Sequence, residues 1–314
     1  MKAYFVQSTE RGTTLELREV PQPQPAAGKL LLRVRAASLN RGEFIRGHGL
    51  TKAGAAKPAG TDGAGEVLGS GKRVMGRLPG AFGEYALMDE PDAIAVPDSL
   101  SWEEAAAIPI TFLVVYDMLV QQGRLHPNEW LLVTGVSAGV GVAALLAAKA
   151  IGAKVIGTSG SSAKLEALKR HGLDVGIATR KPDFHDAVMK ATDGKGVNLV
   201  VNNVGGSVFA ETIRVLGYQG RHATVGYVDG VLESKIDLEA LHSKRLTLFG
   251  VSNKLRTAAQ RALTVQGFTR DWLPLFASGK LKPLVDRVYD FADLPKAVDR
   301  MEADAHVGKI VVRI

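Results

Sequence analysis

Short apolar runs separated by glycine and proline characterise the first hundred residues. Runs of strand length occupy residues 30–39, 65–69 and 84–89, and the opening residues 1–12 resemble a further strand. Apolar runs of this length between turn residues are typical of β-strands joined by short loops. This part of the chain is therefore predicted to be an irregular module made mostly of β-strands.

The pattern changes near Trp102, where an apolar helix is expected to begin. Ser101 is followed three residues later by Glu104, which is the spacing of a capping box. A helical stretch is expected after residue 252, and it should end near Gly279. The chain then returns to β-type and helical patterns at residues 284–291, 292–304 and 308–314.

Between these parts, strands alternate with helical stretches. Such alternation predicts βαβ units and a parallel sheet covered by helices on both faces. The near-continuous apolar character of the strands fits burial on both sides. The predicted fold class is α/β, with a β-rich domain and a doubly wound parallel-sheet domain. Strands are expected at residues 130–136, 154–159, 175–179, 199–206, 220–227 and 245–252, and helices from about 139, over 162–172 and over 208–216.

A glycine turn joins the first of these strands to its helix. The turn runs from Gly135 to Gly141 and has the position of a dinucleotide-binding turn, in which helix N–H groups face the pyrophosphate. Against the pattern G-x-G-x-x-G ending at Gly141, the first two glycine positions hold Val136 and Ala138. The pattern is weak by itself, and a tight turn without a ligand is the alternative.

The end of the second strand lacks a carboxylate. In dinucleotide-binding units an acid about 20 residues after the turn binds the adenine ribose 2′-hydroxyl. Here the neighbourhood holds Ser159, Gly160, Ser161 and Lys164, and Arg180 after the next strand could add a second cation. Hydroxyls and cations suit a 2′-phosphate, so NADPH is the expected dinucleotide. The alternative is a helix N-cap followed by a solvated lysine.

Composition narrows the function classes. The 314 residues suggest two domains, and no apolar window reaches 18 residues. The N-terminus does not resemble a signal peptide, so a cytoplasmic location and no membrane partner are expected. With no cysteine, there is no thiolate nucleophile and no cysteine-bound metal. The formal charge is +7, and the Lys and Arg residues are scattered along the chain. The seven histidines, His48 among them, form no metal-binding pattern. Nucleic acid is an unlikely physiological partner.

Several segments together resemble a known family over nearly the whole chain. They are "RVRAASLNRGEFIRG", "PAGTDGAGEV", "GEYALM", "LSWEEAAAIPITFLVVYDML", "TGVSAGVG", "FASGKLKPLVDRVY" and "GKIVVRI". Each segment alone is weak evidence for a family, but their order and spacing together are specific. The chain resembles the zinc-independent quinone oxidoreductase branch of the medium-chain dehydrogenase/reductases.

The resemblance implies a GroES-like catalytic domain, residues 1–115 and 253–314, with a Rossmann domain inserted at 116–252. It implies a homodimer paired through edge strands, for which residues 245–251 are the candidate. Zinc-dependent relatives bind their catalytic metal with a cysteine and a Gly-His-Glu motif. Here the matching stretch is Gly60-Thr61-Asp62, so the resemblance implies that no metal is used.

The resemblance also implies a set of site residues. Asn40 would lie beside the nicotinamide and substrate, and Glu43 is the candidate for a catalytic acid. Relatives often hold a Tyr near the position of Phe44, which has no proton to donate. The implied cofactor-binding residues are Asn40, Thr111, Ser137, Ala138, Gly139, Val140, Gly141, Ser159, Gly160, Ser161, Lys164, Arg180, Asn203, Val204, Gly226, Phe249, Val251 and Lys309.

The expected function is therefore NADPH-dependent transfer of a hydride to a quinone or another activated carbonyl or enone, without zinc. The protein would contribute positioning and hydrogen bonding. One alternative is an enoyl or enone (2-alkenal) reductase. The alternative from another class is an NADPH-binding protein with little turnover that acts as a regulator or binds RNA.

Overall fold

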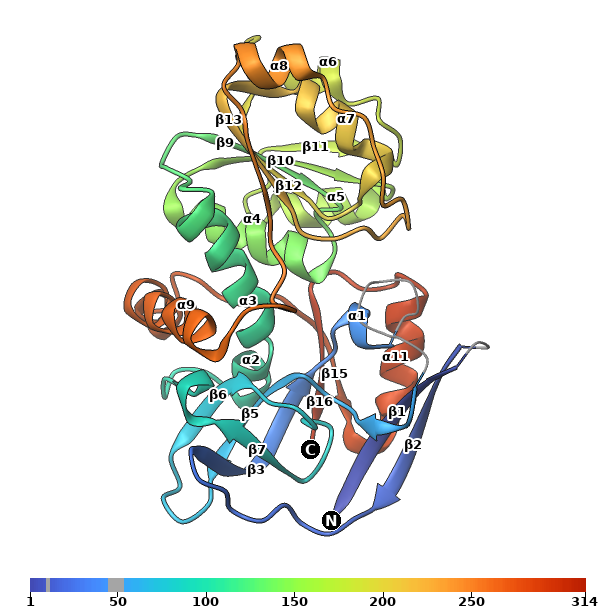
Figure 1. The fold of residues 1–314 in the computed structure, drawn as a ribbon, viewed down its shortest axis with the longest axis vertical. Coiled ribbons are helices and arrows are strands. Elements are labelled where there is room, and N and C mark those ends of the chain that lie inside the picture. The colour runs from blue at the N-terminus through green and yellow to red at the C-terminus, as the bar shows by residue number, and fades with distance from the viewer. Residues whose placement is uncertain (10–11, 45–53) are drawn as a thin grey trace. The chain divides into compact units, whose positions relative to one another are not determined.

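The computed structural model describes residues 1–9, 12–44 and 54–314. The chain divides into two compact units, drawn in Figure 1. One unit is Val114–Leu255 and is built on a parallel sheet; we call it the Rossmann unit. The other joins Met1–Leu113 to Arg256–Ile314 and is rich in β-strands; we call it the β-rich unit. The predicted α/β fold class is confirmed.

The Rossmann unit contains one six-stranded sheet in which every pair of neighbours is parallel. The strand order is β11-β10-β9-β12-β13-β14, so the chain reverses direction of travel across the sheet between β9 and β12. Ligands of open α/β sheets bind at such a reversal, outside the carboxyl ends of the strands. The strands are β9 (Trp130–Thr134), β10 (Lys154–Ser159), β11 (Val175–Ala178), β12 (Val197–Asn202), β13 (Leu216–Thr224) and β14 (Thr247–Gly250).

Helices connect these strands and cover the sheet. The predicted helix after the glycine turn is α4 (Gly139–Ile151), and it ends at Gly152, whose φ of 95° is left-handed. Glycine adopts that conformation without a Cβ clash, so it ends helices well. The other helices are α5 (Ser162–Lys169), α6 (His185–Ala191), α7 (Gly206–Arg214) and α8 (Leu238–Ser243).

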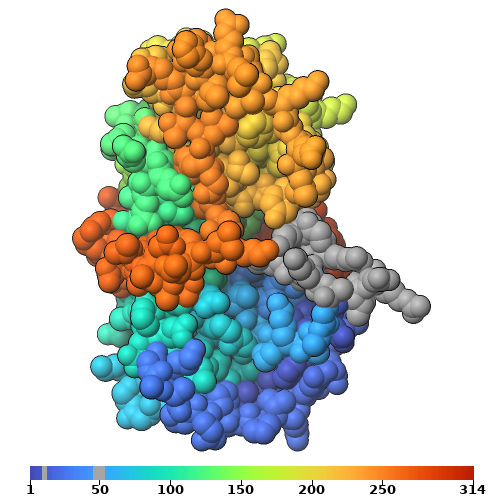
Figure 2. Space-filling model, viewed as in Figure 1, coloured from blue at the N-terminus to red at the C-terminus, as the bar shows by residue number. Residues whose placement is uncertain are grey.

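The predicted last strand of the parallel series is β14, and it lies at the edge of the sheet beside β13. The orange segment that carries α8 and β14 lies at the surface of this unit in Figure 2. Within the described residues, no helix combines the length and apolarity needed to cross a bilayer.

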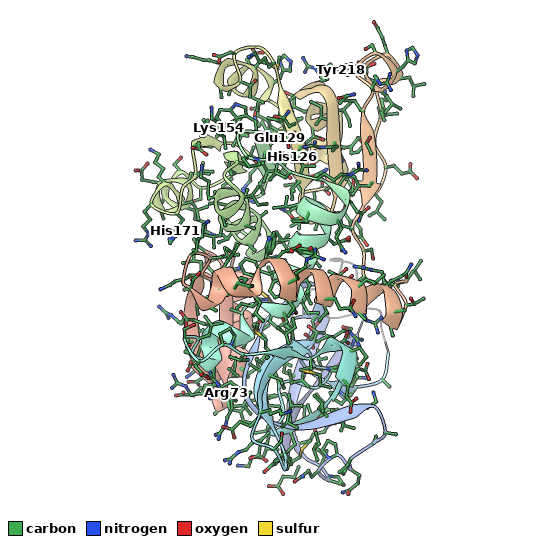
Figure 3. The ribbon with its side chains drawn as sticks, turned by 90° about the vertical axis from the view of Figure 1, so that its left-hand side faces the viewer. Arg73, His126, Glu129, Lys154, His171 and Tyr218 are labelled. Carbon is green, nitrogen blue, oxygen red and sulfur yellow. The ribbon has the colours of Figure 1, made fainter. Side chains whose placement is uncertain are left out.

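Charged side chains connect neighbouring strands at the amino-terminal end of the sheet. Arg221 donates two hydrogen bonds to Glu129, at 3.2 and 2.6 Å. The Lys154 ammonium lies 5.2 Å from the centre of the Trp130 ring, and the two residues begin neighbouring strands. Figure 3 labels Glu129 and Lys154 in this region. The carboxyl end of the same sheet is built differently, as described below.

The β-rich unit contains a three-stranded sheet, β2-β1-β4, and a seven-stranded sheet. The larger sheet runs β15-β16-β3-β5-β6-β8, with β7 paired to β3. Its core packs Phe44 against Phe82 and brings together both ends of the chain. The strands are β1 (Lys2–Thr9), β2 (Gly12–Glu19), β3 (Lys29–Ser38), β4 (Lys57–Pro58), β5 (Asp62–Val67), β6 (Arg73–Arg77), β7 (Tyr85–Asp89), β8 (Ile94–Ala95), β15 (Val285–Asp290) and β16 (Lys309–Arg313).

The predicted capping box is confirmed. Ser101 accepts from the Glu104 backbone N–H, and Glu104 accepts from the Ser101 N–H. The helix that follows is divided before Pro109, because proline lacks the N–H that would continue it. The helical segments of this part are α2 (Trp102–Ala106), α3 (Pro109–Tyr116) and the π-helical η2 (Asp117–Gln122). The remaining ones are α1 (Arg41–Phe44), η1 (Glu90–Asp92), α9 (Ala258–Asp271), α10 (Leu273–Ala277), η3 (Phe291–Asp293) and α11 (Leu294–Glu302).

Candidate functional site

The glycine turn leaves the amino end of α4 open. Ala138 is the N-cap residue and supplies no side-chain cap, and Gly135 turns the chain with a φ of 65°. The first helical turn, Gly139 to Gly141, therefore keeps backbone N–H groups that no side chain satisfies. An open helix N-terminus at the carboxyl end of β9 is suited to an anion such as a pyrophosphate.

Val136, which stands where the glycine pattern has a glycine, points away from this opening. Its side chain is fully buried and fills the space above Gly157 of β10. A Cβ on Gly157 would lie 2.6 Å from a Val136 methyl carbon, and a Cβ on Gly141 would lie 2.5 Å from the Gly135 carbonyl oxygen. The neighbouring strand thus accommodates the valine, and the close approach of the turn to the helix depends on Gly141.

The hydroxyls at the end of β10 form a connected group. Ser159 Oγ lies 3.2 Å from Ser137 Oγ and accepts from the Ser161 backbone N–H at 3.3 Å. Ser161 is the N-cap of α5, because its hydroxyl accepts from the Lys164 N–H. The capping role that the sequence left open is therefore real for Ser161. It places Lys164 in the first turn of α5, with its backbone N–H against the Ser161 hydroxyl.

Arg180 follows β11 and returns to the end of β10. The two strands are parallel, with Ser159 opposite Ala178. The Arg180 side chain lies across Gly160, so closely that a Cβ on Gly160 would lie 2.7 Å from Arg180 Cγ. A residue with a Cβ at position 160 would have to displace the arginine from this position. The structure thus brings together Ser159, Gly160, Ser161 and Arg180, and the backbone of Lys164 follows in the first turn of α5.

At the carboxyl ends of β12 and β13, Asn203, Val204 and Gly226 are neighbours. Asn203 Nδ2 donates to the Thr134 carbonyl at 3.0 Å, and Gly226 approaches the Asn203 carbonyl so closely that a Cβ would lie 3.3 Å away. Buried Asn202 fixes this corner, since its Oδ1 accepts from the Thr134 hydroxyl and from the Val204 N–H. Among these residues, Asn202 and Thr134 are the ones that sequence reasoning missed.

Phe249 and Val251 lie at the end of the edge strand. Phe249 pairs with Ala223 of β13, and the Val251 N–H donates to the Thr224 carbonyl at 3.0 Å. Because that N–H is already used, the group that Val251 can offer a ligand is its carbonyl.

The β-rich unit holds a separate buried polar cluster. Asp62 begins β5 and is fully buried, and Lys309 begins β16 and is 5% exposed. The Asn40 carboxamide joins them: its Nδ2 donates to Asp62 at 2.7 Å and to the Thr61 hydroxyl at 2.9 Å, while Lys309 Nζ donates to Asn40 Oδ1 at 2.8 Å. Lys309 also donates to the Leu39 carbonyl at 2.8 Å. Residues that are 270 positions apart in sequence thus form one network.

Further donors surround Asp62. The Ser38 hydroxyl lies 3.2 Å from both carboxylate oxygens, and the Ile110 N–H at the start of α3 donates at 3.3 Å. Burial raises the pKa of Asp62 and lowers the pKa of Lys309, while the attraction between the two charges opposes both shifts. Thr111, the next residue of α3, is buried.

Glu43 lies beside this cluster in α1. Its Oε1 accepts from the Gly60 N–H, and its Oε2 is buried without a hydrogen-bond partner among the described residues. Burial raises the pKa of Glu43 to about 7, and the Thr61 hydroxyl is adjacent to the carboxyl group. A carboxyl group whose pKa lies close to 7 is partly protonated at neutral pH, so it can donate a proton. Residues 45–53, which include His48, lie outside the described part.

Sequence reasoning missed Ser38, Thr61 and Asp62 as members of the polar cluster. Asp62 carried one signal, because an acid inside a Gly-rich, otherwise apolar strand must find a partner. The partner itself could not be read from local sequence. Over the described residues, no group of three or more His, Asp or Glu side chains is placed to share a metal ion.

Comparison with known proteins agrees with this architecture. Residues 139–265 match the family model described as "Zinc-binding dehydrogenase". The chain is 31% identical, over 96% of its length, to part of a phenolphthiocerol/phthiocerol polyketide synthase of Mycobacterium tuberculosis. It spans only 14% of that protein.

Two further similarities cover most of both chains. The synaptic vesicle membrane protein VAT-1 homolog of Homo sapiens is 28% identical, over 95% of this chain and 82% of that protein. The quinone oxidoreductase of Thermus thermophilus, solved also in complex with NADPH, is 27% identical and superposes with a TM-score of 0.83 over 100% of both chains.

Proposed function

Since the chain belongs to the medium-chain dehydrogenase/reductase superfamily, we propose that it is an NADPH-dependent oxidoreductase that reduces quinones or other activated carbonyl or enone compounds. The observation that carries the cofactor assignment is the carboxyl edge of the parallel sheet. There an open helix N-terminus stands beside Ser159, Lys164 and Arg180, and no carboxylate ends β10. When bound, NADPH supplies the hydride.

The residues of the Rossmann unit fit this cofactor. Gly139 and Gly141 would face the pyrophosphate with backbone N–H groups, as the close contact of Gly141 with Gly135 allows. Lys164 and Arg180 would hold the 2′-phosphate, which an acid at the end of β10 would repel. Asn203, Val204, Gly226, Phe249 and Val251 would bind the rest of the dinucleotide at the ends of β12, β13 and β14.

Glu43 is a group of the β-rich unit that can move a proton. Reduction of an enone adds a hydride to the β-carbon and a proton to the α-carbon. Glu43 has a pKa of about 7, and its buried Oε2 has no hydrogen-bond partner within residues 1–9, 12–44 and 54–314, so it can be the acid for the second of these additions. This observation, with the similarity to part of a polyketide synthase, favours an enone or enoyl reductase as the second candidate.

A direct test compares the two nicotinamide cofactors. We expect calorimetry to give NADPH at least a tenfold lower Kd than NADH, a difference of about 1.4 kcal/mol. Adding a benzoquinone, phenanthrenequinone or a 2-alkenal should then oxidise NADPH, followed through the absorbance of the reduced nicotinamide.

Each outcome decides between the functions. Faster turnover of the alkenal than of the quinones would select the enone reductase. Tight NADPH binding without turnover of any acceptor would favour the regulatory or RNA-binding role and reject the enzyme. Equal affinity for NADH would reject the assignment of Ser159, Lys164 and Arg180.

A further inference from the structure

The hydrogen-bonding capacity of the Asn40 side chain can be counted in full. A carboxamide has two N–H donors and two lone pairs on its oxygen. Both donors are used inside the protein, by Thr61 Oγ1 at 2.9 Å and by Asp62 Oδ1 at 2.7 Å. One lone pair accepts from Lys309 Nζ at 2.8 Å. Within the part of the chain that the structure describes, one lone pair of Oδ1 remains.

The neighbours of Asn40 allow only this orientation of the carboxamide. An ammonium group can donate but not accept, and a carboxylate can accept but not donate. Rotating the carboxamide by 180° would place its NH₂ group against Lys309 and its oxygen against Asp62. Two charge-assisted hydrogen bonds would become two repulsive contacts with side chains that are no more than 5% exposed.

Asn40 itself is half-buried, whereas Asp62 and Lys309 are no more than 5% exposed, so part of the Asn40 surface is accessible. We propose that Lys309 and Asp62 are positioning residues that make Asn40 an acceptor-only group in the reaction. Its open edge accepts from a ligand hydroxyl or N–H, such as a sugar hydroxyl or a carboxamide of the cofactor. It donates no hydrogen bond to the substrate oxygen. The proposal rests on the proposed function for the identity of the ligand.

This assignment has a mechanistic consequence. When a hydride reaches a quinone or an enone, negative charge develops on the carbonyl oxygen, and a hydrogen-bond donor stabilises it. Asn40 is excluded from that role, because neither of its N–H groups is free. Its contribution is the orientation of a ligand through the acceptor edge.

The first test uses the unmodified protein and side-chain amide NMR. The Asn40 resonances can be assigned by their loss in Asn40→Ser. We expect both Asn40 side-chain protons to exchange with solvent at least about tenfold more slowly than those of exposed Asn128, because both are hydrogen-bonded internally. They should stay protected when NADPH is added. A proton that exchanges as fast as those of Asn128, or that transfers its hydrogen bond to a ligand, would overturn the proposal.

The second test exchanges the amide and the carboxylate. Asn40→Asp alone brings a carboxylate against Asp62, and we expect it to be destabilised. In Asn40→Asp with Asp62→Asn, the net charge, the partner of Lys309 and the acceptor edge at position 40 are all kept. Its melting temperature should match that of the unmodified protein, and its NADPH Kd should be at least about tenfold lower than that of Asn40→Asp alone.

The outcomes separate the two proposals. A double variant that melts like the unmodified protein but binds NADPH no more tightly than Asn40→Asp alone would overturn the proposal, because the restored acceptor edge would then not be what the ligand uses. If the double variant does not fold, proton protection in the unmodified protein still decides. If the unmodified protein oxidises no NADPH with any acceptor, the proposed function fails. The amide exchange rates still test whether Asp62 and Lys309 fix the orientation of the Asn40 carboxamide.

Discussion

The two units build their polar sites in opposite ways. At the carboxyl edge of the Rossmann sheet, backbone N–H groups and hydroxyls come from the short loops at the ends of neighbouring strands, such as Ser137 after β9 and Ser159 and Ser161 at the end of β10. In the β-rich unit, ionisable side chains come from distant parts of the chain, as with Asp62 and Lys309. The first arrangement is open to an anion, whereas the second satisfies its own charges.

This difference predicts where the fold is sensitive to lost charge. A site made of backbone N–H groups loses ligand affinity when it is disturbed, because its groups can return to water. A buried ion pair loses stability when one partner is removed, because the other charge stays buried without compensation.

Lys309→Met should therefore have the largest effect on folding. It leaves the Asp62 carboxylate buried without the ammonium, and we expect the free energy of unfolding to fall by about 3–5 kcal/mol. Urea denaturation measures this change. Adding Asp62→Asn to Lys309→Met removes the unpaired charge and should recover most of the loss. If Lys309→Met costs less than about 1 kcal/mol, the comparison between the two units fails.

Glu43, another buried ionisable group of the β-rich unit, should make the stability of the fold depend on pH. Its pKa is about 7 in the folded protein and 4.5 as an ordinary glutamate, so the folded state binds the proton more tightly. The group therefore stabilises the fold fully at low pH, and that contribution is lost as the pH rises from about 5 to about 8. The lost free energy is on the order of 3 kcal/mol.

Glu43→Gln removes this titration. Relative to the unmodified protein, the variant should gain about 3 kcal/mol at pH 8 and little at pH 5, as measured by urea denaturation at both values. Glu166→Gln, at an exposed position on α5, is the matched control and should show no such difference. If Glu43 is also the proton donor, Glu43→Gln should slow enone reduction, and the unmodified enzyme should slow above about pH 7.

A glycine substitution probes the packing beneath the open site of the Rossmann unit. In Gly157→Ala the new methyl group would lie 2.6 Å from a Val136 methyl carbon, in a fully buried contact. Overpacking of this kind costs about 1–3 kcal/mol, and it should also displace the turn and weaken NADPH binding. Gly157→Ala combined with Val136→Ala should recover both the melting temperature and the affinity. A Gly157→Ala protein that melts and binds like the unmodified one would contradict this packing.

The features that the sequence could predict are those that depend on local patterns, and the contacts between distant residues could not be predicted. The βαβ alternation, the start of α4 at Gly139 and the capping box at Ser101 are local patterns, and all three are confirmed. The helix expected from Trp102 begins there, and it is divided before Pro109, which has no backbone N–H to continue the hydrogen-bond pattern.

The polar cluster of the β-rich unit could not be predicted from such patterns. Asn40 and Lys309 were named through a family resemblance, but the contact between them depends on the pairing of β16 with β3. The same holds for Val136, which departs from the glycine pattern. Its tolerance depends on Gly157 in the next strand, a residue with no motif of its own. Non-local pairing decides both cases.

The smallest predicted effect concerns the cations at the end of β10. Arg180→Met and Lys164→Met should each weaken NADPH binding about tenfold, or about 1.4 kcal/mol, and leave NADH binding unchanged, because only NADPH carries the 2′-phosphate. Calorimetry with both cofactors measures the ratio. Lys181→Met removes one charge from the neighbouring exposed position and controls for the general field of the protein. An equal loss in Lys181→Met would mean that the net positive charge, rather than the placement of Arg180 over Gly160, attracts the cofactor.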